Sequence, residues 1–174
     1  MEDSELARRV YRSSHLTGNF ILRSGKTSNE YFDKYLFESD PGILGELAGR
    51  LTKHVPPGVE VLAGLELGGI PIATAISLRS GIPVVFVRKR PKEYGTKKTV
   101  EGTEITGRRV CVIEDVVTTG GQVIESVEEL RKLGAKVDSV LCVIVREEKA
   151  FQNLAGVGLT LRALFAMDDL ARYA

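Results

Sequence analysis

Two adjacent acids precede a loop of threonines and glycines in the segment IEDVVTTGGQ, residues 113–122. Glu114 and Asp115 can accept hydrogen bonds from sugar hydroxyls and can help to hold a divalent cation. The two threonines supply hydroxyl donors, and the two glycines let the backbone approach a ligand closely. If the loop opens a helix, its free backbone N–H groups attract phosphate. The segment therefore predicts a site for a small ligand with a diol and a phosphate, such as ribose 5-phosphate.

The alternative for this segment is an ordinary strand-to-helix turn with an acid pair on the surface. The two common phosphate-binding motifs offer no competing explanation, because the sequence contains neither a GxxxxGK[ST] P-loop nor a GxGxxG dinucleotide turn.

A basic segment, FVRKRPKEYGTKKTVEG (residues 86–102), is the second candidate for chemistry. Between Arg88 and Lys98 it carries six basic side chains and a single acid, Glu93. Such a run is usually solvated or contacts nucleic acid. Here it leaves the carboxyl end of a predicted strand, and two glycines flank its second half. These features predict a lid that closes over a phosphate-bearing ligand and excludes water.

The elements that must position these segments alternate between strand and helix from residue 59 onward. Predicted strands cover residues 59–65, 83–89, 108–115, 137–147 and 159–166, and predicted helices cover 68–81 and 123–134, with a short helix from Met167. Nearly continuous aliphatic strands indicate a sheet covered by helices on both faces. Their alternation with helices indicates βαβ units and a parallel sheet. Ligands bind such sheets beyond the carboxyl ends of the strands.

The first 58 residues do not follow this alternation. We predict a helix over residues 4–14, a hairpin of strands 19–25 and 29–35, and a helix from Asp40-Pro41 to about Lys53. The fold class is therefore α/β, with a central, mostly parallel sheet flanked by helices and a small N-terminal hood. We predict one domain, residues 1–174. It comprises a hood (1–40), expected to bind the second ligand discussed below, a ligand-binding core (about 41–150) and a C-terminal strand and helix (151–174).

Composition limits the other possibilities. At 174 residues, 43% hydrophobic and 27% charged, the chain is typical of one globular domain. The formal net charge of +1 gives no general attraction to nucleic acid or membrane. Cys111 and Cys142 lie in apolar runs and are expected to be core thiols. His15 and His54 show no metal-ligand spacing. The acidic N-terminus is not a secretory signal, and no run is long enough to span a membrane, so we expect a cytoplasmic protein.

The segment IEDVVTTGG closely resembles the phosphoribosyl-pyrophosphate (PRPP) motif of the type I phosphoribosyltransferase family. Two further segments resemble the orotate-using branch of that family. FILRSGKTSNEYFD (residues 20–33) is similar to its N-terminal signature, and residues 88–95 are similar to its Arg-Lys-x-x-Lys-x-His-Gly catalytic loop. Arg146 in VIVREE matches an arginine that contacts orotate in this branch. The resemblance covers nearly the whole chain, and the three motifs occur in the family's order.

This resemblance implies a role for each matching residue. PRPP would be bound by Arg88, Lys89, Lys92, Tyr94, Glu114, Asp115, Val116, Val117, Thr118, Thr119, Gly120, Gly121 and Gln122. Arg88, Lys89 and Lys92 would also be catalytic, because they stabilise the departing pyrophosphate. Orotate would be bound by Arg23, Lys26, Tyr31, Phe32, Thr118 and Arg146. The cations suit an anionic base and the aromatic side chains offer it flat faces, although a surface hairpin with a packed aromatic pair is the alternative for residues 20–33.

Two positions depart from the family pattern. Tyr94 stands where the catalytic loop usually has histidine, which leaves its role open. Gly68 in GLELGGIPIA (residues 64–73) stands in the pyrophosphate loop, where bacterial relatives often have lysine. Without that lysine, backbone amides of this loop, or Arg and Lys side chains of the lid, would have to bind the pyrophosphate.

The activity that the resemblance implies is transfer of the phosphoribosyl group from PRPP to orotate, giving orotidine 5'-monophosphate and pyrophosphate. Mg²⁺ would be held mainly by PRPP, with Asp115 as a possible ligand and no other metal site. The protein would be a homodimer whose lid reaches the neighbouring subunit's site, without nucleic-acid or membrane partners. Two alternatives stay open: a phosphoribosyltransferase for a purine or another base, and a non-catalytic regulator that senses PRPP. The hood signature and Arg146 disfavour the first, and the absence of a strong basic face disfavours the second.

Overall fold

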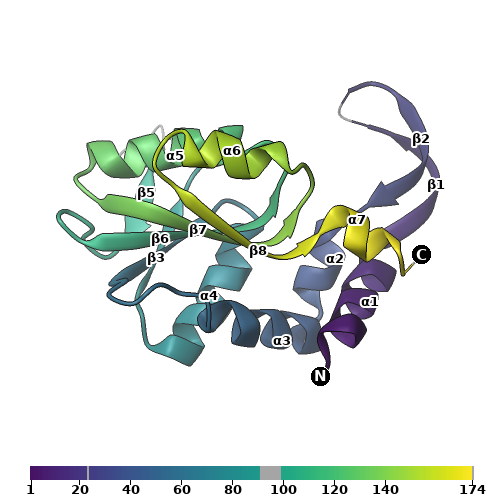
Figure 1. Ribbon diagram of the computed structural model, residues 1–174, viewed down its shortest axis with the longest axis horizontal. Coiled ribbons are helices and arrows are strands. Elements are labelled where there is room, and N and C mark those ends of the chain that lie inside the picture. The colour runs from purple at the N-terminus through teal and green to yellow at the C-terminus, as the bar shows by residue number, and fades with distance from the viewer. Residues whose placement is uncertain (23, 91–98, 174) are drawn as a thin grey trace.

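One six-stranded sheet forms the centre of the computed structural model, which describes residues 1–22, 24–90 and 99–173 (Figure 1). Its strands are β3 (Val61–Leu65), β4 (Val84–Val87), β5 (Val100–Gly102), β6 (Arg109–Val117), β7 (Lys136–Val145) and β8 (Thr160–Ala166). They lie in the order β5-β4-β3-β6-β7-β8, and every neighbouring pair is parallel except β4 with β5. The predicted α/β fold with a mostly parallel central sheet is confirmed.

Helices cover both faces of this sheet. α3 (Pro41–Thr52) and α4 (Gly69–Ser80) lie on one face, and α5 (Gly121–Lys132) and α6 (Lys149–Ala155) lie on the other (Figure 1). Buried apolar side chains form a separate cluster on each side: Val112 of β6 belongs to the α5–α6 side and Ile113 to the α3–α4 side. Successive side chains of a strand point to opposite faces, so a strand buried on both faces is aliphatic throughout.

The hood packs beyond one end of the sheet. It consists of α1 (Asp3–Ser14), an antiparallel hairpin of β1 (His15–Ile21) and β2 (Thr27–Phe32), and α2 (Lys34–Ser39), and α7 (Met167–Ala171) lies beside α1 (Figure 1). Among the residues that the structure describes, no helix has the length and apolar character needed to cross a membrane.

Several predicted boundaries in the hood are wrong. The strands expected over residues 19–25 and 29–35 lie at 15–21 and 27–32, and a helix begins at Lys34 where the second strand was expected to continue. Asp33 ends the strand because its side chain accepts a hydrogen bond from the backbone N–H of Tyr35 (3.1 Å) and caps α2. The sequence analysis also missed β5 and α6. The helix start at Asp40-Pro41 is confirmed, since Asp40 caps α3 through the N–H groups of Gly42 and Ile43.

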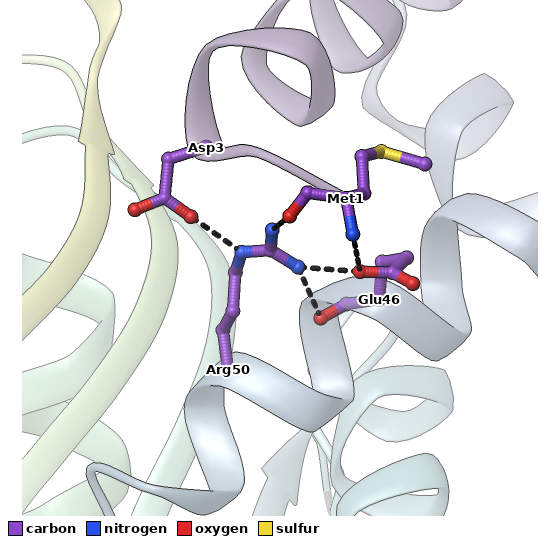
Figure 2. A network of polar contacts seen from close by, with 4 residues as sticks. All are labelled: Met1, Asp3, Glu46 and Arg50. Atoms are coloured by element: carbon purple, nitrogen blue, oxygen red, sulfur yellow. Dashed lines mark hydrogen bonds and ion pairs between the residues drawn. The ribbon is translucent and has the colours of Figure 1, made fainter.

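Arg50 of α3 fastens the start of the chain to the core. Its guanidinium donates to Asp3 (2.8 Å) and Glu46 (2.6 Å) and also to the carbonyl of Met1, as Figure 2 shows. Because three partners surround one side chain that is only 17% exposed, this network holds α1 against α3. α1 in turn supports α2, which packs against both α1 and α3.

The strand order creates a crevice at the carboxyl ends of β3 and β6. From β3 the chain passes through α4 to β4 on one side, while β6 lies on the other side of β3. At such a switch point the connections leave in opposite directions, and open α/β sheets bind their ligands there. The acid pair and the Thr/Gly loop follow β6, and the segment 66–69 follows β3. Both therefore meet at this crevice.

Candidate functional site

The loop between β6 and α5 encloses a pocket of about 240 Å³. Glu114 and every residue from Val116 to Val123 line it. α5 begins at Gly121 without a side-chain cap, so backbone N–H groups at a helix N-terminus lie in the pocket wall. Partial positive charge, donor groups and small residues make this a suitable cradle for a phosphate.

A helix that the sequence analysis missed supports this loop. Asn153 of α6 donates a side-chain hydrogen bond to the carbonyl of Thr119 (2.9 Å). Gly120 has a left-handed backbone (φ 90°), and a Cβ added there would lie 3.1 Å from Leu154 of α6. No motif pointed to Asn153, because its contact is made by packing of α6 over the loop.

The two adjacent acids have different neighbours. Glu114 lines the loop pocket, whereas Asp115 is fully buried and faces α2. The Asp115 Oδ2 atom lies 2.6 Å from Nζ of Lys34. The sequence analysis treated the acids as a pair acting on one sugar diol. In this structure Glu114 lines the loop pocket. Asp115 does not line it and instead forms an ion pair with Lys34 of the hood.

Four ionisable side chains meet behind the pocket. Glu38 of α2 is 5% exposed and Glu114 is 8% exposed, and burial raises the pKa of both, with the nearby charge of Asp115 adding to the effect. The pKa of Glu38 is raised to about 9. Burial also opposes ionisation of Asp115, but hydrogen bonds with Glu114 and Glu38 and the charge of Lys34 lower its pKa overall. At neutral pH the ionised pair is therefore Lys34 with Asp115.

Gly68, noted above as a departure from the family pattern, packs directly on these acids. A Cβ at this position would lie 1.7 Å from Asp115 Oδ2 and 2.8 Å from Glu38 Oε1. The backbone is in the ordinary helical region (φ −68°), so close approach alone requires glycine here. No lysine or other side chain fits at position 68 in this arrangement.

A second pocket, of about 370 Å³, lies between the hood and the sheet. It is lined by Tyr11, His15, Leu22, Ser28, Glu30, Tyr31, Phe32, Arg146, Met167 and Ala171. Three of the residues predicted to bind orotate are in its wall: Tyr31, Phe32 and Arg146. Lys26 is exposed in the hairpin and does not line the pocket, Thr118 lines the loop pocket instead, and Arg23 lies outside the described residues.

The two pockets meet at one backbone hydrogen bond. The N–H of Arg146, just beyond β7, donates to the carbonyl of Val117 at the end of β6 (2.8 Å). Arg146 belongs to the second pocket and Val117 to the loop pocket. The walls of the two pockets are therefore connected through paired main-chain atoms at the ends of β6 and β7.

The beginning of the predicted lid also reaches the loop pocket. Arg88 and Lys89 line a cavity of about 430 Å³ together with Gln122, which is shared with the loop pocket. The Arg88 side chain pairs with Glu101 (3.3 Å), and the Lys89 N–H donates to Glu66 (2.8 Å). The remaining predicted lid residues, Lys92 and Tyr94, lie outside the described residues.

The residues of the described part of the chain do not form a ready-made metal site, since no group of three or more His, Cys, Asp or Glu side chains there is arranged to hold an ion. Cys111 and Cys142 are buried free thiols, as predicted.

A mostly parallel six-stranded sheet, with the Thr/Gly loop after β6 at the switch point between β3 and β6, is the type I phosphoribosyltransferase fold. Residues 42–155 match the family model described as the phosphoribosyl transferase domain. Curated relatives are more specific. The chain is 48% identical over 168 residues to an orotate phosphoribosyltransferase of Nocardioides sp., covering 97% of this chain and 94% of the relative. It is 40% identical to that of Methanocella arvoryzae, covering 98% of both chains. The chain therefore belongs to the orotate phosphoribosyltransferase family.

Solved structures agree with this assignment. Orotate phosphoribosyltransferase of Mycobacterium tuberculosis in complex with Fe(III) dicitrate has a TM-score of 0.82 and 34% identity, covering 97% of this chain and 98% of that one. The same enzyme in complex with PRPP has a TM-score of 0.78 and 32% identity, with the same coverage.

Proposed function

We propose that this protein transfers the 5-phosphoribosyl group from PRPP to orotate, giving orotidine 5'-monophosphate and pyrophosphate in the synthesis of UMP. The observation that carries this proposal is the backbone hydrogen bond that joins Arg146, in the wall of one pocket, to Val117, in the wall of the other. One pocket suits a ribose phosphate and the other suits a flat anionic base, so the two reacting groups would lie side by side. The names of the curated relatives support the same activity.

The chemistry needs charge stabilisation more than proton transfer. The bond from ribose C1 to pyrophosphate breaks, positive charge develops on the sugar ring, and a nitrogen of the anionic orotate forms the new bond. The backbone N–H groups of residues 118–122 would hold the 5-phosphate, and Glu114 would accept a hydrogen bond from the sugar. Arg146 would pair with the carboxylate of orotate, while Tyr31 and Phe32 would contact its ring.

The departing pyrophosphate requires cations. Arg88 and Lys89 are placed beside Gln122 of the loop pocket, and Lys92 and Tyr94 follow them in the sequence. Mg²⁺, carried mainly by PRPP itself, would add positive charge at the leaving oxygens. Glu114 lines the same pocket and would have to lose its proton to share such an ion, because burial raises its pKa. Asp115, the ligand expected from the sequence, would first have to leave Lys34.

We also propose that the protein works in the cytoplasm as a homodimer in which each lid closes over the partner's site. In this arrangement residues 1–40 bind mainly the base, and residues from about 41 to 150 bind PRPP. Residues 151–174 form the C-terminal strand and helix, and Met167 and Ala171 of this part line the pocket proposed for the base. Mixing a Lys92→Ala variant with an Asp115→Asn variant should restore part of the activity. No recovery after subunit exchange would show that each site is self-contained.

The activity is tested by following the loss of orotate absorbance after addition of PRPP and Mg²⁺, with uracil and the purine bases as controls. We expect orotate alone to be consumed, with one pyrophosphate released for each orotate. Consumption of a purine base in place of orotate would establish the alternative transferase. PRPP binding without consumption of any base would establish the regulator.

A further inference from the structure

Lys34, the first residue of α2, brings a positive charge from the hood into the crevice between β3 and β6. Its Nζ lies 2.6 Å from Oδ2 of Asp115. The Lys34 side chain is 34% exposed, whereas Asp115 is not exposed at all. The ammonium group therefore lies between a buried carboxylate and solvent, where a ligand can reach it.

The contact between these two groups leaves donors of Lys34 available. An ammonium group has three N–H donors. The contact with Oδ2 of Asp115, at 2.6 Å, engages one of them. Burial favours the protonated form of the neighbouring Glu38 and Glu114, so these acids do not neutralise Lys34 further. Lys34 can thus hold Asp115 by charge and still donate hydrogen bonds to an anion.

The backbone at Gly68 and Gly69, close to the carboxylate that Lys34 contacts, has no room for a side chain. Gly68 lies against Asp115, and a Cβ added at Gly69 would be 2.3 Å from the carbonyl of Ile113. α4 begins at Gly69 with no side-chain cap, but the N–H of Ile70 donates to the carbonyl of Leu67 and Pro71 has no N–H. Among the described residues, the N–H groups of Gly68 and Gly69 have no backbone acceptor and remain as donors. The loop after β3 can therefore offer backbone N–H groups but no cation. Lys34 supplies a cation beside this loop, at Oδ2 of Asp115.

We propose that Lys34 is a further PRPP-binding residue, whose ammonium group bridges Asp115 and the diphosphate of PRPP beside Gly68. This inference rests on the proposed function, because it assumes that PRPP is the ligand. The proposal adds one residue of the hood to the residues of the loop and the lid that are proposed to bind PRPP. The bridge places the diphosphate over the 66–69 loop, while the 5-phosphate lies in the loop pocket after β6.

Binding measurements on Lys34→Met and Lys34→Arg test this role. Calorimetry with Mg²⁺ would compare PRPP, pyrophosphate and ribose 5-phosphate, since only the first two carry the diphosphate. Loss of a charge-assisted hydrogen bond predicts about 10- to 100-fold weaker binding of PRPP and pyrophosphate to Lys34→Met. Ribose 5-phosphate should bind with nearly unchanged affinity, and Lys34→Arg should recover most of the lost affinity because it keeps the charge.

Lys132→Met is a matched control. Lys132 also lies 2.6 Å from a carboxylate, that of Glu129, but this pair is at the far end of α5. All three ligands should bind this variant as they bind the unaltered protein.

Two results would overturn the proposal. Unchanged pyrophosphate affinity in Lys34→Met would show that Lys34 does not contact the diphosphate. Equally weaker binding of PRPP, pyrophosphate and ribose 5-phosphate would show that Lys34 acts only by orienting Asp115. If the variants do not fold, amine-reactive labelling of the unaltered protein decides instead: pyrophosphate should protect Lys34, ribose 5-phosphate should not, and equal labelling with and without pyrophosphate would refute the contact. Failure of the unaltered protein to bind PRPP would refute the proposed function itself.

Discussion

Replacing Gly68 by alanine is the most direct test of how the crevice is built. The added Cβ would lie 1.7 Å from Asp115 Oδ2 and 2.4 Å from its Cγ. Carbon and oxygen atoms in ordinary contact are about 3.5 Å apart, so the loop and the carboxylate must separate by roughly 2 Å. The backbone angle at Gly68 suits alanine, and hence the whole effect comes from this collision.

Overpacking of this kind costs about 1–3 kcal/mol, which for a chain of this size corresponds to a melting temperature lower by roughly 2–12 °C. The displacement of the loop by more than ~1 Å should also lower kcat/KM by about 100-fold, since misplacement on this scale disrupts alignment of the reacting groups. Differential scanning fluorimetry and the orotate assay would measure the two effects.

Gly45→Ala provides the control for Gly68→Ala. Gly45 is inside α3, and nothing lies within 4 Å of a Cβ added there. Alanine in a helix is more stable than glycine by about 0.5–1 kcal/mol, so this variant should melt at the same or a higher temperature with unchanged activity. A Gly68→Ala protein that behaved like Gly45→Ala would refute the close-packing argument.

Three other predictions concern the pockets and the buried acids. Arg146→Ala should raise KM for orotate by about 10- to 100-fold and leave KM for PRPP nearly unchanged, and an equal rise in both would contradict its place in the base pocket. Asn153→Ala should raise KM for PRPP by about 3- to 10-fold because the Thr119 carbonyl loses its support, whereas the exposed neighbour Gln152→Ala should have no effect. Glu38 has a pKa of about 9 in the folded chain and an ordinary value of 4.5, so between these values the folded state binds more protons than the unfolded state. The stability from this group is complete below pH 4.5 and declines as the pH rises toward 9, and chemical denaturation should show a flatter pH dependence for Glu38→Gln.

The parts of the fold that depend on local signals were predictable from the sequence. The cap at Asp40 and the aliphatic strands of the core are short-range patterns, and they are confirmed. α2 and α6 were missed because they are short, and helices of one or two turns are stabilised mainly by their packing. The sequence YFDKYLF (residues 31–37), which spans the end of β2 and the start of α2, also has the aromatic composition of a strand, and this hides the cap at Asp33.

The candidate site was predictable only where its residues are consecutive. Glu114 and residues 116–122 line a pocket at the expected end of the expected strand, although the roles given to them stay predictions. The meeting of Lys34 and Glu38 with Asp115 was not predictable, because it depends on how the hood docks against the sheet. The packing at Gly68 is another example: its sequence context resembles a loop that often carries lysine, and only the position of Asp115 shows why glycine stands there.

The hydrogen bond between Arg146 and Val117 has a consequence for protein engineering. It joins main-chain atoms, so it survives any substitution at position 146 other than proline. The side chain at position 146 can therefore be varied while β6 and β7, on either side of the Thr/Gly loop and α5, keep their alignment. New acceptor specificities should be accessible from the hood side without rebuilding the rest of the catalyst.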